Sequence, residues 1–196
     1  QAERERPHFG GDLGTLVPSG KLPVRRESGG PAQNLVVVGN SIYSNTQGGV
    51  SIESSYGCSV RDNDIEGPVV PAQPLLHLTG NQVYISGNTL GLAKGSNGTA
   101  ALFSGSNIVS SGGSFTINGP NQTALVIACH ADGHCPAGVL VQGAVFAAPG
   151  GHAAGTGLRI GRGVQHAVVT SPLFANGFFS EVLDEGEATT FVPARP

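Results

Sequence analysis

The sequence contains no methionine and no tryptophan, and charged residues make up only 12% of its 196 residues. Soluble domains carry about 25% charged residues, so we expect a lightly charged surface here. The net charge of -3 does not favour binding to a polyanion, and we therefore expect no nucleic-acid partner. No run of about 18 apolar residues occurs, so the sequence predicts no transmembrane helix and no membrane insertion.

The sequence also shows neither an initiator methionine nor a signal peptide ahead of Gln1. We expect the chain to be a processed product or a piece of a longer protein. Cysteine is also scarce, with three residues in all. Cys129 and Cys135 bracket a short loop that a disulfide could close, whereas Cys58 is left over. A disulfide favours an oxidising location, and we expect an extracellular, cell-surface or virion protein.

What is abundant is glycine, with 31 residues, together with a hydrophobic fraction of 39% that is sufficient for one packed core. The chain divides into three parts. Residues 1–33 show no strand alternation and are expected to form an N-terminal arm or linker. Residues 34–182 carry an internal repeat. Residues 183–196 contain three acids and are expected to form a C-terminal tail or cap.

The repeat is an apolar-x-x-Asn-x-apolar pattern with asparagines at positions 40, 63 and 88, a step of about 23–25 residues. Looser copies in which glycine or serine replaces asparagine continue it to six turns. Each Asn is expected at a bend, where its amide can bond backbone groups and stack on the Asn of the next turn. The six copies are Val37/Asn40/Ile42, Val60/Asn63/Ile65, Ile85/Asn88/Leu90, Gly113 before Phe115, Leu140/Gly143/Val145 and Val168/Ser171/Leu173.

A second series of apolar pairs shares the same period of about 25 residues, and each pair alternates with the strand period of two. Two interleaved strand series with one period predict short parallel strands stacked in coils, each pair pointing into the core. The fold class is therefore all-β, a parallel β-helix solenoid of about six coils. The pairs are Val50/Ile52, Leu76/Leu78, Ala101/Phe103, Leu125/Ile127 and Leu158/Ile160.

The segment NSIYSNTQGGVSIESSYGCSVRDNDIEG, residues 40–67, is the most typical stretch. Residues 34–182 resemble the right-handed parallel β-helix, or pectin-lyase-like, superfamily, which includes pectate lyases, polygalacturonases, alginate epimerases and phage tailspikes. The resemblance implies a right-handed solenoid that is tailspike-like or polysaccharide-lyase-like. A left-handed hexapeptide helix is set aside because its repeat is shorter, at about 18 residues.

The resemblance also implies that any active site lies on the outer face of one parallel sheet. In the second series this face is expected to carry Ser51, His77, Leu102, Val126 and Arg159, followed in the chain by Glu53, Thr79, Ser104, Ala128 and Gly161. The residues expected to contact a glycan are Ser51, His77, Thr79, Ser104 and Arg159.

The catalytic residues are unknown, and the candidates are Glu53, His77 and Arg159. Glycoside hydrolysis needs two carboxyl groups about 5–9.5 Å apart, and Glu53 has no acidic partner in this sheet. A lyase or epimerase needs a base beside a cation that neutralises a uronate. His77 and Arg159 are expected three coils apart, about 14 Å, which is too far for one site.

Two local features remain. Asp62, Asp64 and Glu66 are expected at the bend around Asn63, either as turn residues or as a catalytic or calcium-binding group. The segment CHADGHC, residues 129–135, is expected to be a disulfide-closed loop with polar residues at its tip. Its alternative role is a metal site made of His130, Asp132 and His134, which three copies could share on the axis of a trimer.

Two functions remain in competition. The first is a non-catalytic structural or adhesive β-helix of a virion spike or extracellular protein, which self-associates, most simply as a trimer, and presents a face to glycans. The second is a polysaccharide lyase, glycoside hydrolase or uronate epimerase acting on acidic polysaccharide. We expect no cofactor, apart from the calcium or other metal considered above.

Overall fold

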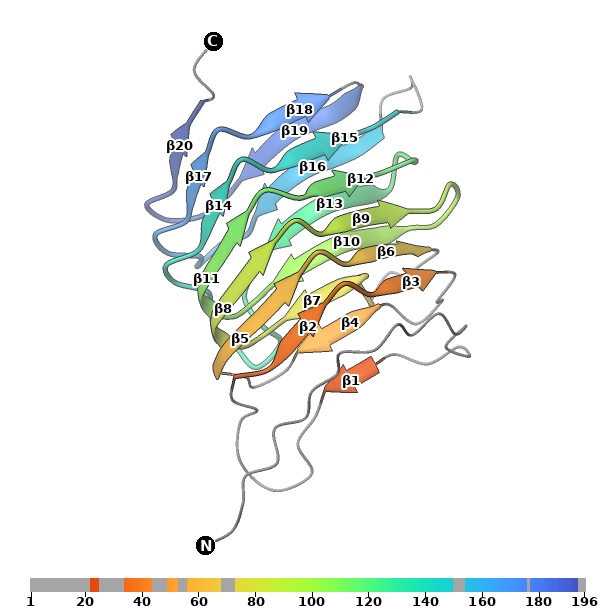
Figure 1. Cartoon of the computed structure of the whole chain (residues 1–196). Coiled ribbons are helices and arrows are strands. Elements are labelled where there is room, and N and C mark those ends of the chain that lie inside the picture. The colour runs from red at the N-terminus through yellow and green to blue at the C-terminus, as the bar shows by residue number, and fades with distance from the viewer. Residues whose placement is uncertain are drawn as a thin grey trace, which may run out of the picture.

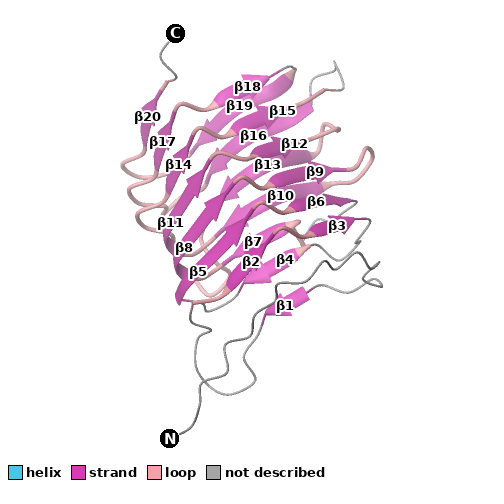
Figure 2. Ribbon diagram, in the orientation of Figure 1, coloured by secondary structure: helices cyan, strands magenta, loops and turns pink. Residues whose placement is uncertain are grey.

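The chain forms a parallel β-solenoid whose coils stack from the N-terminal to the C-terminal end (Figure 1). In this computed structural model the described residues are 22–24, 34–43, 49–52, 56–67, 73–149, 154–175 and 177–193. Within these ranges every strand pairing is parallel, and no helix is present (Figure 2). The all-β solenoid of about six coils, with a period of about 25 residues, is confirmed.

Among the described residues, each of six coils contributes one strand to each of three sheets, and a last, partial coil adds one strand to sheet A and one to sheet B. Sheet A consists of β1 (Leu22–Val24), β4 (Val50–Ile52), β7 (Leu76–Leu78), β10 (Gly98–Phe103), β13 (Gln122–Ile127), β16 (Ala154–Ile160) and β19 (Phe178–Asp184). Sheet B consists of β2 (Val36–Val38), β5 (Tyr56–Arg61), β8 (Asn81–Ser86), β11 (Ser106–Ser111), β14 (Leu140–Gln142), β17 (Val168–Thr170) and β20 (Thr190–Val192). Sheet C consists of β3 (Ser41–Tyr43), β6 (Asp64–Gly67), β9 (Thr89–Leu92), β12 (Ser114–Thr116), β15 (Val145–Ala147) and β18 (Leu173–Ala175).

The bend between sheet B and sheet C has the same backbone conformation in every coil. One residue in each bend has φ between 49° and 67°, in the left-handed region. Glycine, or a short polar residue that tolerates this region, therefore recurs there. The series is Gly39, Asp62, Gly87, Gly112, Gly143 and Ser171.

The asparagine ladder occupies the next position of the bend. Asn40 Nδ2 donates to Asn63 Oδ1, and Asn63 Nδ2 donates to Asn88 Oδ1, each at 2.9 Å. Asn63 Nδ2 also donates to the carbonyl of Val37, so the amides bond backbone as well as one another. Gly113 continues the column, and a Cβ there would lie 2.8 Å from the Asn88 carbonyl oxygen. The predicted bend and stacking of the asparagines are confirmed.

The inward pairs predicted for sheet A are also confirmed. Ile52, Leu78, Phe103, Ile127 and Ile160 form one column through the interior, and all five are fully buried. Burying a side chain of this size contributes about 1.5–3 kcal/mol relative to its exposure. The stacking of like residues in successive coils thus builds a continuous core.

In sheets B and C, the inward residues predicted for the fifth and sixth coils were wrong by one position. Val141 and Phe146 are fully buried, whereas Leu140 and Val145 lie on the outer face and are only half-buried. In the sixth coil Leu173 is likewise outward and 56% exposed. The segment from 139 to 148 is almost wholly apolar, so alternation cannot identify its inner face. Stacking decides it, because Phe146 lies 5.3 Å from Phe115 and 5.0 Å from Phe174 between ring centroids.

Strand pairing extends on both sides of the 34–182 segment. β1 pairs with β4, and β20 pairs with β17. The rest of the predicted arm, 1–21 and 25–33, lies outside the described residues. Asp184 stands in the last coil where Ile160 stands in the coil before it. Its Oδ1 accepts hydrogen bonds from Gly186 N at 2.9 Å and Thr189 Oγ1 at 3.2 Å, which ends the apolar column with a polar cap.

Candidate functional site

The outer face of sheet A has the predicted register. Ser51, His77, Leu102, Val126 and Arg159 are paired in that order across successive strands, so His77 and Arg159 lie three coils apart. Leu102 and Val126 separate the two polar ends of this column. Ser51 is 2% exposed, which leaves little of its hydroxyl for a ligand.

The residues that follow these strands differ in accessibility. Thr79 is half-buried, and its Oγ1 donates to the Ile52 carbonyl at 3.3 Å. Ser104 is 5% exposed and lies 3.3 Å, Oγ to Nε2, from His77. Glu53 lies outside the described residues.

The segment 129–135 forms a closed loop between β13 and β14. Cys129 and Cys135 are joined by a disulfide. Within the loop, His130 N donates to the His134 carbonyl at 2.7 Å, and Gly133, with φ +90°, turns the chain at the tip. The disulfide faces Gly163 of the next coil, where a Cβ would lie 2.8 Å from Cys135 Sγ. Only a residue without a side chain fits beneath the sulfur atoms.

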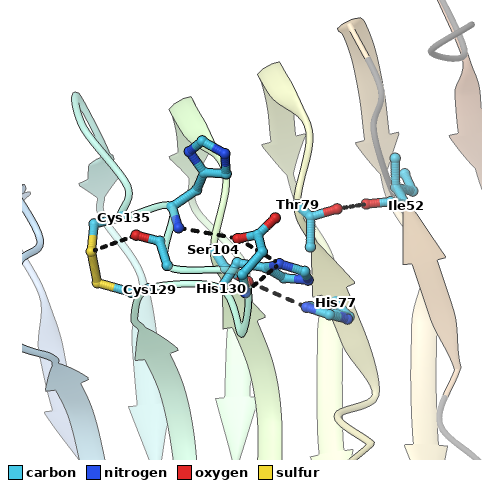
Figure 3. Close-up of polar contacts among 10 residues, drawn as sticks. Ile52, His77, Thr79, Ser104, Cys129, His130 and Cys135 are labelled. Carbon is cyan, nitrogen blue, oxygen red and sulfur yellow. Dashed lines mark hydrogen bonds and ion pairs between the residues drawn. A yellow bond between two sulfur atoms is a disulfide. The ribbon is translucent and has the colours of Figure 1, made fainter.

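The loop reaches back over the ends of the sheet A strands to an earlier coil (Figure 3). The His130 ring stacks on the His77 ring, with centroids 6.4 Å apart and planes at 21°. Since His77 belongs to β7 and the loop follows β13, this contact crosses two strand spacings. His77, Ser104, His130 and Asp132 therefore form one polar group, which we call the loop cluster.

Asp132 holds the loop cluster together through its carboxylate. Its Oδ1 accepts a hydrogen bond from His134 N at 3.0 Å and lies 3.0 Å from His130 Nδ1. The backbone N–H of His134 is the main reason that the pKa of Asp132 is below its usual value, and the His130 side chain adds to it. Across the described ranges, no three His, Cys, Asp or Glu side chains are grouped so as to hold a metal ion.

Arg159 forms an ion pair with Glu185, away from the loop cluster. Its Nη2 lies 3.5 Å from Glu185 Oε2, and Arg162 Nε lies 3.9 Å from Glu185 Oε1. Glu185 belongs to the last coil and is only partly exposed. Arg159 is therefore part of a surface ion pair at one end of the solenoid, and it does not join the loop cluster.

A second group of polar residues lies on the outer face of sheet C, and the sequence analysis identified only its acidic members as candidates. Asp62 stands at the predicted bend, but Asp64 and Glu66 lie in strand β6, with the buried Ile65 between them. Their expected place at the bend was therefore wrong. Both side chains are on the solvent side of sheet C because residues two apart in a strand share a face.

A hollow of about 340 Å³ opens beside Glu66. Its wall crosses four coils, from β3 to β12, and the floor is formed at Gly91, which pairs with Glu66. A Cβ on Gly91 would lie 3.2 Å from Glu66 Cγ and 3.4 Å from Glu66 Oε1, so the glutamate side chain lies directly over this glycine. The polar and aromatic wall residues are Tyr43, Glu66, Thr89, Thr116 and Asn118.

Tyr43 stands at one rim of this hollow, in register with Glu66, and its side chain is 52% exposed. Its hydroxyl donates to Asp64 Oδ2. That hydrogen bond is the main reason that the pKa of Tyr43 is raised, because ionised phenol cannot donate it. The other oxygen of Asp64, Oδ1, is buried and has no hydrogen-bond partner.

The signal for this hollow in the sequence was the alternation of Asp64, Ile65 and Glu66, together with a glycine one period later. Tyr43 and Gly91 could be placed beside Glu66 only once the strand register was known. The hollow is therefore a product of stacking between coils.

Comparisons with known proteins add no assignment. No family model, no curated protein and no solved structure matches this chain. The parallel solenoid is thus established by the strand pairing alone. In the part of the chain that the structure describes, no helix is long and apolar enough to cross a membrane.

Proposed function

We propose that this chain is a non-catalytic, adhesive β-solenoid domain that binds a glycan in the hollow on sheet C. The observation that carries the proposal is the hollow itself, with an exposed tyrosine at its rim and hydroxyl, amide and carboxylate groups along its wall. Aromatic rings pack against the C–H faces of sugars, and a few placed polar groups fix orientation. The wall crosses several coils, which suits an extended chain lying along the stack.

The hollow is a better glycan site than the outer face of sheet A. Two of the five residues predicted to bind there, Ser51 and Ser104, are almost fully buried. His77 and Arg159 are separated by apolar residues and are each engaged by other side chains. The separation of His77 from Arg159 also supports a non-catalytic role, since a base and a neutralising cation are not brought together on this sheet.

The test is to measure glycan binding by calorimetry with the wild-type chain and two tyrosine variants. Tyr43→Ala is expected to weaken binding at least tenfold, because it removes the aromatic rim of the hollow. Tyr84→Ala is the matched control, since Tyr84 is 58% exposed but lies on sheet B. Equal losses in both variants, or no binding of neutral, acidic or basic glycans, would overturn the proposal. Release of unsaturated or reducing ends would overturn its non-catalytic part.

Self-association is the second part of the proposal. What supports it is the last coil, where Phe179 is 82% exposed and strand β20 pairs on one side only within the described residues. Unpaired strand edges and exposed apolar side chains favour contact with another copy. Sedimentation velocity of the wild type and of Phe179→Ser tests this, with a larger fraction of monomer expected for the variant. A wild type that stays monomeric at high concentration would contradict it.

A further inference from the structure

The charged residues at the hollow on sheet C limit the class of glycan that it can bind. Glu66 places its carboxylate over the floor at Gly91, and no ion pair with a described residue neutralises it. Asp64 stands beside it on the same strand. The surroundings of the hollow are therefore rich in acceptors and carry negative charge.

The donors in the wall are uncharged: they are the hydroxyl groups of Tyr43, Thr89 and Thr116 and the amide of Asn118. Tyr43 supplies one hydroxyl hydrogen, which Asp64 Oδ2 accepts, while Asp64 Oδ1 remains buried without a partner. Lys94 follows Ala93, a wall residue, but forms no ion pair with a described carboxylate. Glu66 is the one carboxylate among the described wall residues, and an incoming ligand that carries a positively charged donor would pair with it.

We propose that the hollow selects a cationic amino sugar, a glycan whose units carry free ammonium groups. This inference rests on the proposed function and specifies its ligand. An ammonium near the Glu66 carboxylate would form a charge-assisted hydrogen bond and would also lie beside the Tyr43 ring, where a cation is attracted to the aromatic face. The carboxylates of a polyuronate would meet Glu66 and Asp64 as like charges, so acidic polysaccharides are disfavoured.

Gly91 is the residue that makes the arrangement possible. Its backbone is not in the left-handed region, so alanine is compatible with the chain conformation at this position. The added methyl group would press on Glu66 Cγ and displace the carboxylate from the floor. Gly91→Ala therefore perturbs the carboxylate without removing its charge.

The experiment compares four probes by calorimetry: hexamers of glucosamine, N-acetylglucosamine and galacturonate, and spermine as a cation that is not a sugar. The glucosamine hexamer is expected to bind at least tenfold more tightly than the other three, and its binding should weaken as salt is raised. Glu66→Gln and Gly91→Ala should each reduce that binding about tenfold or more. Glu181→Gln is the matched control, because Glu181 is an exposed glutamate on β19 in the last coil.

The outcomes separate this inference from the proposed function. Equal binding of the glucosamine and N-acetylglucosamine hexamers would overturn the preference for ammonium groups and leave glycan binding intact. Tighter binding of galacturonate, or of spermine, would likewise overturn it. If Glu181→Gln weakens binding of the glucosamine hexamer as much as Glu66→Gln does, the hexamer is attracted to the overall negative charge of the surface. That result would reject the hollow as the binding site. If no hexamer binds at all, the proposed function fails as well.

Discussion

Asn63 Nδ2 donates a hydrogen bond of 2.9 Å to Asn88 Oδ1, joining the bends of two successive coils through side chains that are both buried. Asn63 Oδ1 in turn accepts from the backbone N and from Nδ2 of Asn40. One amide thus satisfies groups in the coil before it and in the coil after it. The stability of the N-terminal coils should depend on it.

Asn63→Ala is expected to lower the free energy of unfolding by about 2–4 kcal/mol, because it leaves several buried polar groups without partners. Denaturant unfolding measures the change. Asn121→Ala is the control, since Asn121 is exposed and a surface substitution changes stability by only about 0.5 kcal/mol. Similar losses for both variants would contradict the role of the ladder.

Ser110 occupies a core position between Ile85 and Val141, and its buried Oγ has no hydrogen-bond partner. Ser110→Val is expected to stabilise the protein by about 1 kcal/mol, because it replaces an unsatisfied hydroxyl with the kind of side chain found in adjacent coils. Thermal unfolding measures this. The neighbouring Ser111→Val, on the exposed face, should have little effect. If Ser110→Val and Ser110→Ala both lower the stability of the protein, Ser110 does not face the core, and the register of β11 with β8 and β14 is wrong.

The register of the fifth coil can be tested with a pair of adjacent residues. Phe146→Ala should cost about 3–5 kcal/mol, because it removes a ring stacked between Phe115 and Phe174. Val145→Ala should cost less than about 1 kcal/mol, because Val145 lies on the outer face and is only half-buried. Urea titration of both variants measures the loss of unfolding free energy in each. A larger loss in Val145→Ala than in Phe146→Ala would show that Val145 faces the core, as the sequence pattern predicted.

The pKa of Tyr43 is raised above 10.0 mainly by its hydrogen bond to Asp64. A group whose pKa is raised on folding contributes stability below its unfolded pKa, and this contribution is lost as the pH rises through the folded pKa. Asp64→Asn should move the pKa of Tyr43 back toward 10.0. Titration of ring-labelled tyrosine by NMR measures the shift, with Asp62→Asn as the control in the same coil. No change in Asp64→Asn would refute this hydrogen bond.

The loop 129–135 should respond to acid through Asp132, whose pKa is lowered from 3.8 by the His134 backbone N–H and then by the His130 side chain. A lowered carboxyl pKa gives stability that is present above the unfolded value and lost as the pH falls through the folded one. The loop contacts are therefore expected to persist to below about pH 3.8 and then weaken. The His134 amide NMR signal reports this, and in Asp132→Asn it should show no such transition. An Asp132 that titrates at or above 3.8 would contradict the geometry.

The residues of the repeat show which parts of the fold could be predicted from the sequence. The alternation of Val50 and Ile52 around Ser51, and its recurrence at intervals of about 25 residues, requires only that one face of each strand be buried. The asparagines at a fixed step likewise predicted a ladder at the bend. Polar and apolar residues alternate in these coils, and the pattern alone therefore identifies the inner face. Between 139 and 148 they do not alternate, and the assignment was displaced by one residue.

The sequence by itself determined the repeat, the parallel stacking and the inward residues of sheet A, together with those of sheets B and C in the first four coils. These features depend on a local period that the chain repeats. Only the tertiary structure decided which residues meet across coils. It set the face of Phe146, brought His130 back onto His77, and placed Tyr43, Glu66 and Gly91 around one hollow. The physical reason is that register and loop placement depend on packing between segments that lie one or more whole coils apart in the chain, which no local pattern encodes.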